Sequence, residues 1–166
     1  MEKKSTLQFL APYAIGLIAI RLLIDTIIKQ FELGYQGEFW GGVISFFIII
    51  GFVFLTIFNY KTYNNNNQLK FIEGIKVGVA LVLILGLIYT IYISVIYTKI
   101  DPTYQERLFE EASKQLLAQN PDADTSVLNK TQDNSVVFGM AMNLIKYIFI
   151  GALGSIVTSA ILKTDR

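Results

Sequence analysis

Two long runs of the sequence contain no charged residue, and they limit the chain to very few kinds of fold. The first covers residues 39–60 (FWGGVISFFIIIGFVFLTIFNY), and the second covers residues 77–98 (VGVALVLILGLIYTIYISVIYT). Each run of about 22 residues would make a helix about 33 Å long, which matches the hydrocarbon core of a bilayer. Soluble helices of that length usually have a polar face. Both runs therefore predict transmembrane helices.

Two further apolar runs are interrupted by a few charges. Arg21, Asp25 and Lys29 lie in the first of them, and Lys146 lies in the last. With 53% hydrophobic and 16% charged residues in the whole chain, we expect an all-α integral membrane protein and a single four-helix membrane domain over residues 1–166. The four transmembrane helices are predicted at about 9–30, 39–60, 75–98 and 135–162, with residues 99–134 as a helical extracytoplasmic insertion.

The distribution of basic residues predicts the orientation, because Lys and Arg gather in cytoplasmic connections. Segment 99–134 carries seven acids against four bases, and the connection QFELGYQGE has two Glu and no basic residue. Both termini are therefore predicted to be cytoplasmic, in the cell inner membrane, with residues 99–134 outside. The basic residues of the cytoplasmic side are Lys3, Lys4, Lys61, Lys70, Lys76, Lys163 and Arg166, and the predicted interfacial aromatics are Tyr35, Phe39, Trp40, Tyr60 and Tyr63.

The outer segment IDPTYQERLFEEASKQLLAQ has the pattern of a helix. Asp101 is predicted to cap it and Pro102 to take its first position, and apolar residues recur every four positions from Tyr104 to Leu116. This apolar stripe fits a lid or docking surface, or a helix that lies on the membrane or on its own bundle. Residues 122–134 are predicted to form short turns.

Small residues repeat every four positions on the third and fourth predicted helices. Such stripes let two helix backbones approach closely in lipid. We expect these contacts to be within one chain. The residues are Gly74, Gly78 and Gly86 on one helix and Gly151, Ser155 and Ser159 on the other.

The chain contains no cysteine and no histidine. This excludes disulfides, thiol nucleophiles and the usual zinc ligands, as well as the commonest general base. We therefore expect no catalytic residue, no bound metal and no cofactor. A net charge near +1 without a basic soluble face also argues against nucleic acid as a partner.

The charges inside the first span are the main clue to function. Arg21, Asp25 and Lys29 share one stripe of a helix, and Lys29 is near enough to the outer end to reach the headgroups. A charge at the centre of a span costs about 2.5–3.5 kcal/mol, so partners are required. Counted along the spans, Lys146 lies between Arg21 and Asp25 in depth, and Asp25 is predicted to bridge the two cations. The predicted intramembrane polar cluster is Arg21, Asp25, Lys146, Asn143, Tyr89 and Tyr92.

Three interpretations of this cluster remain open. The charges fix helix packing by pairing with one another, or they form an interface with another membrane protein or a second copy. Alternatively, they line an outward cavity with a net positive charge that suits an anionic lipid or a small anion. The first two predict a non-catalytic subunit or scaffold. The third predicts a small transporter or a lipid- or anion-handling protein.

Three motifs resemble one bacterial membrane-protein family over essentially the whole chain. They are FIEGIKVG at 71–78, IDPTY at 100–104 and GALGSIVTSAILK at 151–163, and together they are similar to the family called domain of unknown function 4199. The resemblance implies a four-helix membrane domain without family catalytic residues. It also implies an association with lipid-linked glycosyltransferase genes, which adds an accessory role in lipid-linked glycan synthesis to the alternatives.

The predicted orientation is tested by single cysteines, since the chain has none of its own. In intact cells, Ala118→Cys should react with a thiol reagent that does not cross the inner membrane, and Asn66→Cys should react only after lysis. The reverse labelling pattern would contradict the orientation.

Overall fold

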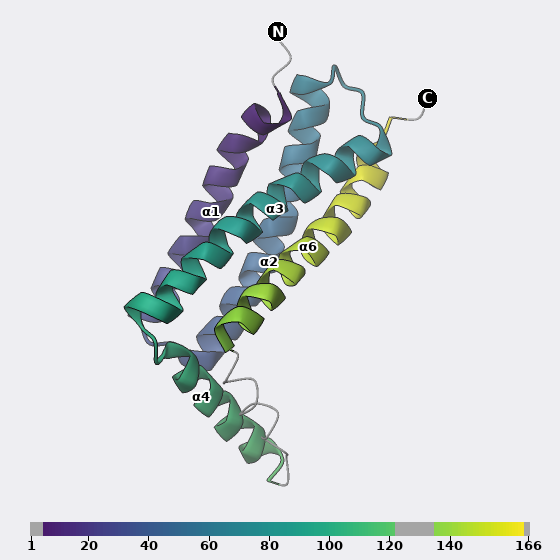
Figure 1. Ribbon diagram of the computed structural model, residues 1–166. Coiled ribbons are helices and arrows are strands. Elements are labelled where there is room, and N and C mark those ends of the chain that lie inside the picture. The colour runs from purple at the N-terminus through teal and green to yellow at the C-terminus, as the bar shows by residue number, and fades with distance from the viewer. Residues whose placement is uncertain (1–4, 122–134, 165–166) are drawn as a thin grey trace.

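The computed structural model describes residues 5–121 and 135–164, and this part of the chain is helical with short connections (Figure 1). Four of its helices are long and apolar enough to cross a membrane. The predicted all-α membrane fold with four transmembrane helices is therefore confirmed. The helices are α1 (Thr6–Gln30), α2 (Gly34–Asn59), α3 (Phe71–Val95), α4 (Tyr104–Gln119) and α6 (Ser135–Leu162); π-helical turns η1 (Tyr60–Asn64) and η2 (Ile96–Ile100) extend α2 and α3.

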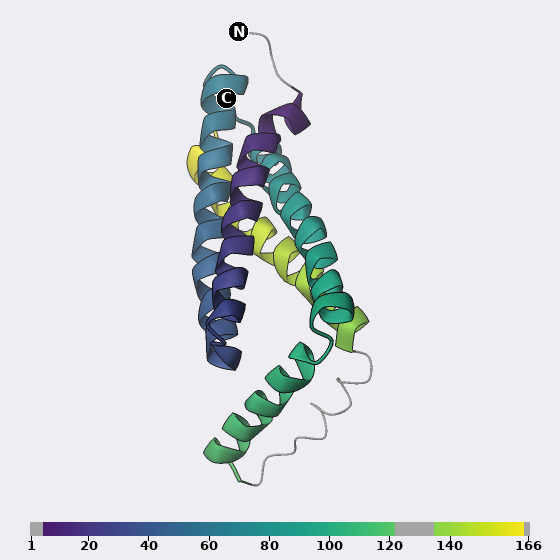
Figure 2. The same ribbon diagram turned by 90° about the vertical axis from the view of Figure 1, so that its left-hand side faces the viewer.

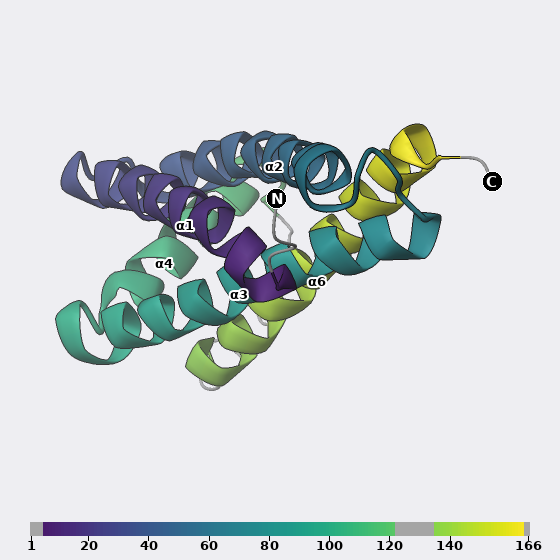
Figure 3. The same cartoon turned by 90° about the horizontal axis from the view of Figure 1, so that it is seen from above.

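The four long helices run up and down as a bundle. Helix α1 begins and α6 ends at one end, which we call the termini end; α4 lies beyond the opposite end, the α4 end (Figures 1 and 2). Helices α3 and α6 share the most extensive contact, and α2 packs against both α1 and α6. Viewed along the bundle, α1 and α2 form one side, while α3 and α6 form the other (Figure 3).

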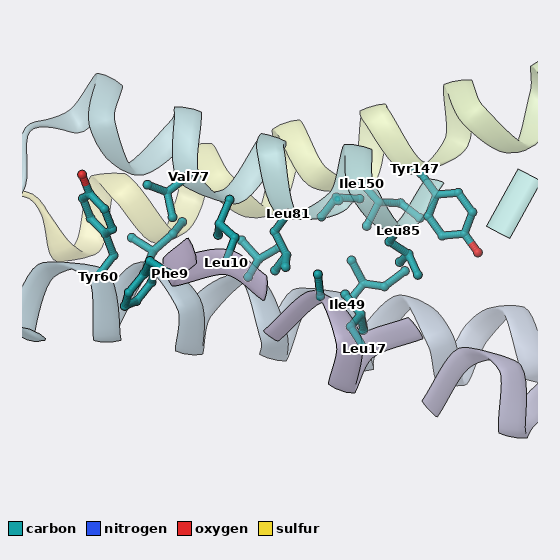
Figure 4. Close-up of a cluster of buried hydrophobic side chains, with 14 of the residues drawn as sticks. Phe9, Leu10, Leu17, Ile49, Tyr60, Val77, Leu81, Leu85, Tyr147 and Ile150 are labelled. Carbon is teal, nitrogen blue, oxygen red and sulfur yellow. The ribbon is translucent and has the colours of Figure 1, made fainter. Parts of the chain in front are cut away.

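The core lies between these two sides (Figure 4). Its central side chains are fully buried and come from all the long helices, including Leu10, Ile49, Leu81, Leu85 and Tyr147. The outer surface is apolar as well. Phe47 and Ile161, for example, are each 68% exposed. An outer surface of this kind fits hydrocarbon rather than water.

The small-residue stripes pack α3 directly against α6. A Cβ atom at Gly74 would collide with the side chain of Ser159, and one at Gly78 with the side chain of Ser155. Close approach of the two backbones replaces the hydrophobic drive that lipid does not supply. The prediction that these stripes join helices within one chain is confirmed.

Local signals in the sequence explain the helix ends at the termini end. Ser5 and Gln8 form a reciprocal capping box at the start of α1. In the NNNN loop, Asn66 and Asn67 adopt φ values of 50° and 60°, a conformation that asparagine tolerates better than most residues. Lys61 Nζ donates to the last carbonyl of α6, that of Leu162, at 2.9 Å. A cation there also complements the helix dipole.

Three predictions about single residues are wrong. Tyr60 is only 8% exposed and faces the bundle instead of the lipid headgroups, because its ring makes an edge-to-face contact with Phe9 of α1. Asp101 does not cap α4 and Pro102 does not take its first position, because the helix begins at Tyr104 after the N-cap residue Thr103. The Asp101 carboxylate instead accepts hydrogen bonds from Thr103 and Arg107. The short turns predicted for residues 122–134 lie outside the described residues.

Helix α4 is attached to the bundle by its first half. The Tyr104 hydroxyl donates to Glu38 Oε1 at 2.6 Å, and the Tyr35 backbone N–H donates to Glu111 Oε2 at 2.6 Å. The remainder of α4 extends away from the bundle (Figure 2), and Leu116 and Leu117 are exposed there. The predicted apolar stripe is thus buried at one end of α4 and exposed at the other.

The α3–α6 contact predicts opposite effects for two Gly→Ala substitutions. A Cβ at Gly151 would lie 2.8 Å from Cβ of Val82, which cannot rotate away, whereas one at Gly51 would meet nothing within 4 Å. We expect Gly151→Ala to destabilise the protein by about 1–3 kcal/mol through overpacking. Gly51→Ala should be neutral or stabilising by up to about 1 kcal/mol. Unfolding in detergent measures both, and equal stability of the two variants would contradict the packing described.

Candidate functional site

The carboxylate of Asp25 is the most deeply buried charge in the described part of the chain, with an exposed fraction of 0%. Its Oδ1 accepts a hydrogen bond from the Tyr89 hydroxyl of α3 at 2.9 Å and lies 3.6 Å from Arg21 Nη2. Its Oδ2 accepts a hydrogen bond from Lys29 Nζ. Two hydrogen bonds and an ion pair therefore replace the water that this carboxylate loses on burial.

The guanidinium of Arg21 joins three helices. Nη2 donates to the Tyr89 hydroxyl at 2.5 Å, and Nε donates to the Tyr147 hydroxyl of α6 at 3.3 Å. Cζ also lies 4.4 Å from the centroid of the Tyr89 ring, in a cation–π contact. Nη1 is buried and has no hydrogen-bond partner among the described residues. We call Arg21, Asp25, Lys29, Tyr89 and Tyr147 the charge cluster.

Lys29 closes the charge cluster at the α4 end. The prediction that it reaches the headgroups is wrong, because Nζ turns back to Asp25, one helical turn away. Nζ also lies 5.3 Å from the ring centroids of Tyr92 and Tyr104. A buried carboxylate and two aromatic faces together hold the ammonium in this position.

Lys146 is not the second cation of Asp25. The predicted bridge from Arg21 through Asp25 to Lys146 does not occur, since no ion pair joins Lys146 to Asp25 within the described residues. Neighbouring residues of a helix point about 100° apart, and Tyr147 takes the inward position with 1% exposed. Lys146 is therefore exposed, and its Nζ lies 5.2 Å from the Tyr147 ring centroid.

Some of the other residues of the predicted intramembrane polar cluster lie in contact with one another, and one does not. Arg21, Asp25 and Tyr89 are in direct contact. Tyr92 lies beside them, with its ring centroid 5.7 Å from that of Tyr89. Asn143 is half-buried on α6 and takes no part in the contacts of the charge cluster.

A cavity of about 610 Å³ lies between α2 and α6, beside Arg21, and we call it the α2–α6 cavity. Arg21, Lys146 and Glu38 line it, and most of its remaining wall is apolar. Arg21 and its hydrogen-bond partner Tyr147 line this cavity, whereas Asp25 does not. The charge cluster thus presents its cationic side to the cavity.

A family model described as "Protein of unknown function (DUF4199)" matches residues 13–164. The chain belongs to this family. No curated protein and no solved structure matches it. The matched range includes the charge cluster and the charged lining of the α2–α6 cavity, so both lie within the DUF4199 domain.

Sequence reasoning missed two residues that shape the site of this DUF4199 protein. Tyr147 follows Lys146 directly, and a tyrosine hydroxyl in the middle of an apolar span was the signal that could have identified it. Glu38 lies one residue before the predicted second span, but α2 begins at Gly34 and includes it. Glu38 therefore lines the cavity instead of lying in a connection.

A second cavity of the DUF4199 domain, about 620 Å³, lies at the α4 end between α1, η2 and α4. One ion pair, between Arg107 and Asp101, lies within its lining. Arg107 Nη2 donates to Asp101 Oδ2 at 2.5 Å, and this hydrogen bond holds the pKa of Asp101 below its ordinary value. Burial and the bond to Glu38 raise the pKa of Tyr104, so its hydroxyl keeps the proton that it donates.

The charge cluster predicts a large effect of Asp25→Asn on stability. The substitution leaves the buried Arg21 and the half-buried Lys29 without their counter-charge, and we expect a loss of about 3–5 kcal/mol. Unfolding of the purified DUF4199 protein in detergent measures this loss. Glu110→Gln is the matched control on α4, because Glu110 makes only an exposed pair with Lys114, which is worth at most about 1 kcal/mol. Similar losses for the two variants would refute a structural role of Asp25.

Proposed function

We propose that this membrane protein binds the anionic head of a membrane lipid in the α2–α6 cavity, without catalysis. One observation carries the proposal: a buried cation with an unmet donor, Arg21 Nη1, stands beside a large cavity that is otherwise mostly apolar. A buried donor without a partner costs free energy. An anion in the cavity would lower that cost and supply the missing acceptor.

Two cations support an anionic ligand. Arg21 is held at the cavity wall by Tyr89 and Tyr147, so its position does not depend on a ligand. Lys146 has no carboxylate within ion-pair distance among the described residues and is exposed at the same cavity. Nη1 itself is covered, so Lys146 makes the first contact and a small side-chain shift admits the anion to Arg21. Phosphate oxygens accept hydrogen bonds from both groups.

The apolar part of the cavity supports a ligand with a hydrocarbon chain. Phe46, Phe47 and Ile150 line it, and Phe47 is 68% exposed on the outer face of α2. That face contacts acyl chains if α2 spans the bilayer. A lipid would therefore enter the cavity laterally from the membrane, and its acyl chain would pack against these residues.

A binding role fits the chemistry of the cluster better than a catalytic one. Asp25 is the one buried carboxylate of the described residues; it is fully enclosed, with Lys29, Tyr89 and Arg21 against its two oxygens. A general base needs a free acceptor within reach of a substrate proton. The proposal therefore assigns no reaction to the protein.

The proposal includes the location of the protein in the cell inner membrane, with the termini end in the cytoplasm and the α4 end outside. The start of α1 and the end of α6 lie at the same end of the bundle, so they lie on the same side of the membrane (Figure 1). The connection that holds Lys61 and Lys70 also lies at the termini end, in accordance with the positive-inside rule. The cavity then opens in the outer half of the bilayer.

A second candidate function is a non-catalytic subunit or scaffold. The observation in its favour is the outer half of α4, where Leu116 and Leu117 are exposed beyond the bundle. Purification in a mild detergent tests it. A stoichiometric protein partner that is lost after Leu116→Ser and Leu117→Ser would favour the scaffold, and a pure protein with bound lipid would favour the first candidate.

The lipid-binding proposal predicts that Lys146→Gln weakens the binding of anionic phospholipid about tenfold, the loss expected for one hydrogen bond to a charged group. Binding is measured by native mass spectrometry of the detergent-solubilised protein titrated with phosphatidylglycerol. Lys146 lies outside the charge cluster, so the variant should keep its stability. Lys114→Gln, which removes an exposed lysine of α4, should leave the affinity unchanged.

A second pair of variants tests the cavity without changing a charge. Gly42 lines the cavity, and a Cβ there would meet nothing within 4 Å. Gly42→Leu should therefore fill the cavity without distorting α2 and block lipid binding. Gly51→Leu adds the same side chain to an open position of α2 outside the cavity and should have no effect. Unchanged lipid binding in both Lys146→Gln and Gly42→Leu would overturn the proposed function.

A further inference from the structure

The three charged groups of the α2–α6 cavity lie at different depths. Counted along the helices from the α4 end, Glu38 lies four residues inside α2, or about 6 Å. Lys146 lies eleven residues inside α6, or about 17 Å, and Arg21 lies nine residues inside α1, or about 14 Å. From the α4 end inward, the cavity therefore presents one anion, then two cations and then apolar wall.

Glu38 is held by α4 and forms no direct ion pair with either cation in the described part of the chain. The Tyr104 hydroxyl of α4 donates to its Oε1 at 2.6 Å and fixes the side chain. No ion pair within 4 Å joins Glu38 to Arg21 or Lys146 in the described part of the chain. A carboxylate has two oxygens and about four acceptor positions, so the bond from Tyr104 leaves capacity for a donor from a ligand.

We propose that the lipid head bound in this cavity carries a phosphate and a primary ammonium, as in phosphatidylethanolamine. The phosphate lies between Lys146 and Arg21, and the ammonium lies nearer the α4 end, where it donates to Glu38. The acyl chain continues inward along Phe46 and Phe47. This inference rests on the proposed function and adds the class of headgroup to it.

The order of charges matches the order of groups in such a lipid. In a phosphatidylethanolamine of the outer leaflet, the ammonium is the outermost group, the phosphate comes next and the chains follow. A head that carries only a phosphate satisfies the two cations but leaves the Glu38 carboxylate without a cation. The hydroxyls of phosphatidylglycerol can donate to Glu38, but they bring no positive charge to offset the carboxylate, whereas the ammonium does both.

The test compares phosphatidylethanolamine and phosphatidylglycerol with identical acyl chains, titrated into the full-length protein and followed by native mass spectrometry. We expect the wild type to bind phosphatidylethanolamine about tenfold more tightly. Glu38→Gln should abolish this preference, because the amide oxygen still accepts from Tyr104 but carries no charge. Glu38→Asp should retain part of the preference. The unfolding temperature of each variant shows that it is folded.

The outcomes separate this inference from the proposed function. Equal affinity of the wild type for both lipids, or a preference that survives Glu38→Gln, would overturn the assignment of the ammonium. If both lipids still lost affinity in Lys146→Gln and Gly42→Leu, the lipid site itself would stand. Should neither lipid bind the wild type, both the site and the headgroup assignment would fail.

Discussion

The burial of the Asp25 carboxylate constrains the rest of the bundle. A charge at the centre of a span costs about 2.5–3.5 kcal/mol even by insertion scales, and this one is fully withdrawn from the surface. Its own helix supplies two cations, and α3 supplies the Tyr89 hydroxyl. Because Arg21 also bonds Tyr147 of α6, satisfying one carboxylate fixes three helices relative to one another. Helices α1 and α6, which pack little against each other, are joined in this way.

The small-residue contact between α3 and α6 serves the same arrangement. Gly78 and Gly151 let the two backbones approach closely, which brings the rings of Tyr89 and Tyr147 together at 5.7 Å between centroids. Both hydroxyls then face Arg21 from two helices. Packing at the termini end thus positions polar groups nearer the α4 end, and a looser contact would separate the two tyrosines.

The sequence was sufficient to predict the fold, because a run of about 22 residues without a charge has few alternatives to a membrane helix. The partners of the charges were harder to predict. The depth of a residue along a helix follows from counting residues, but the direction in which its side chain points depends on how the helix packs. Counting therefore assigned Lys146 to Asp25, whereas in the structure the neighbouring Tyr147 takes the inward position. Lys29 was assigned to the headgroups because the aromatic faces that hold it come from α3 and α4. Glu38 was missed because α2 begins before the uncharged run does.

The structural and the ligand-binding interpretations of the charges apply to opposite ends of one cluster. At the Lys29 end, the Asp25 carboxylate accepts hydrogen bonds from Lys29 and Tyr89, and the bond from Tyr89 joins α1 to α3. At the Arg21 end, Nη1 has no acceptor among the described residues, and the α2–α6 cavity begins there. The unpartnered nitrogen and the adjacent cavity are the two observations on which the proposed ligand rests.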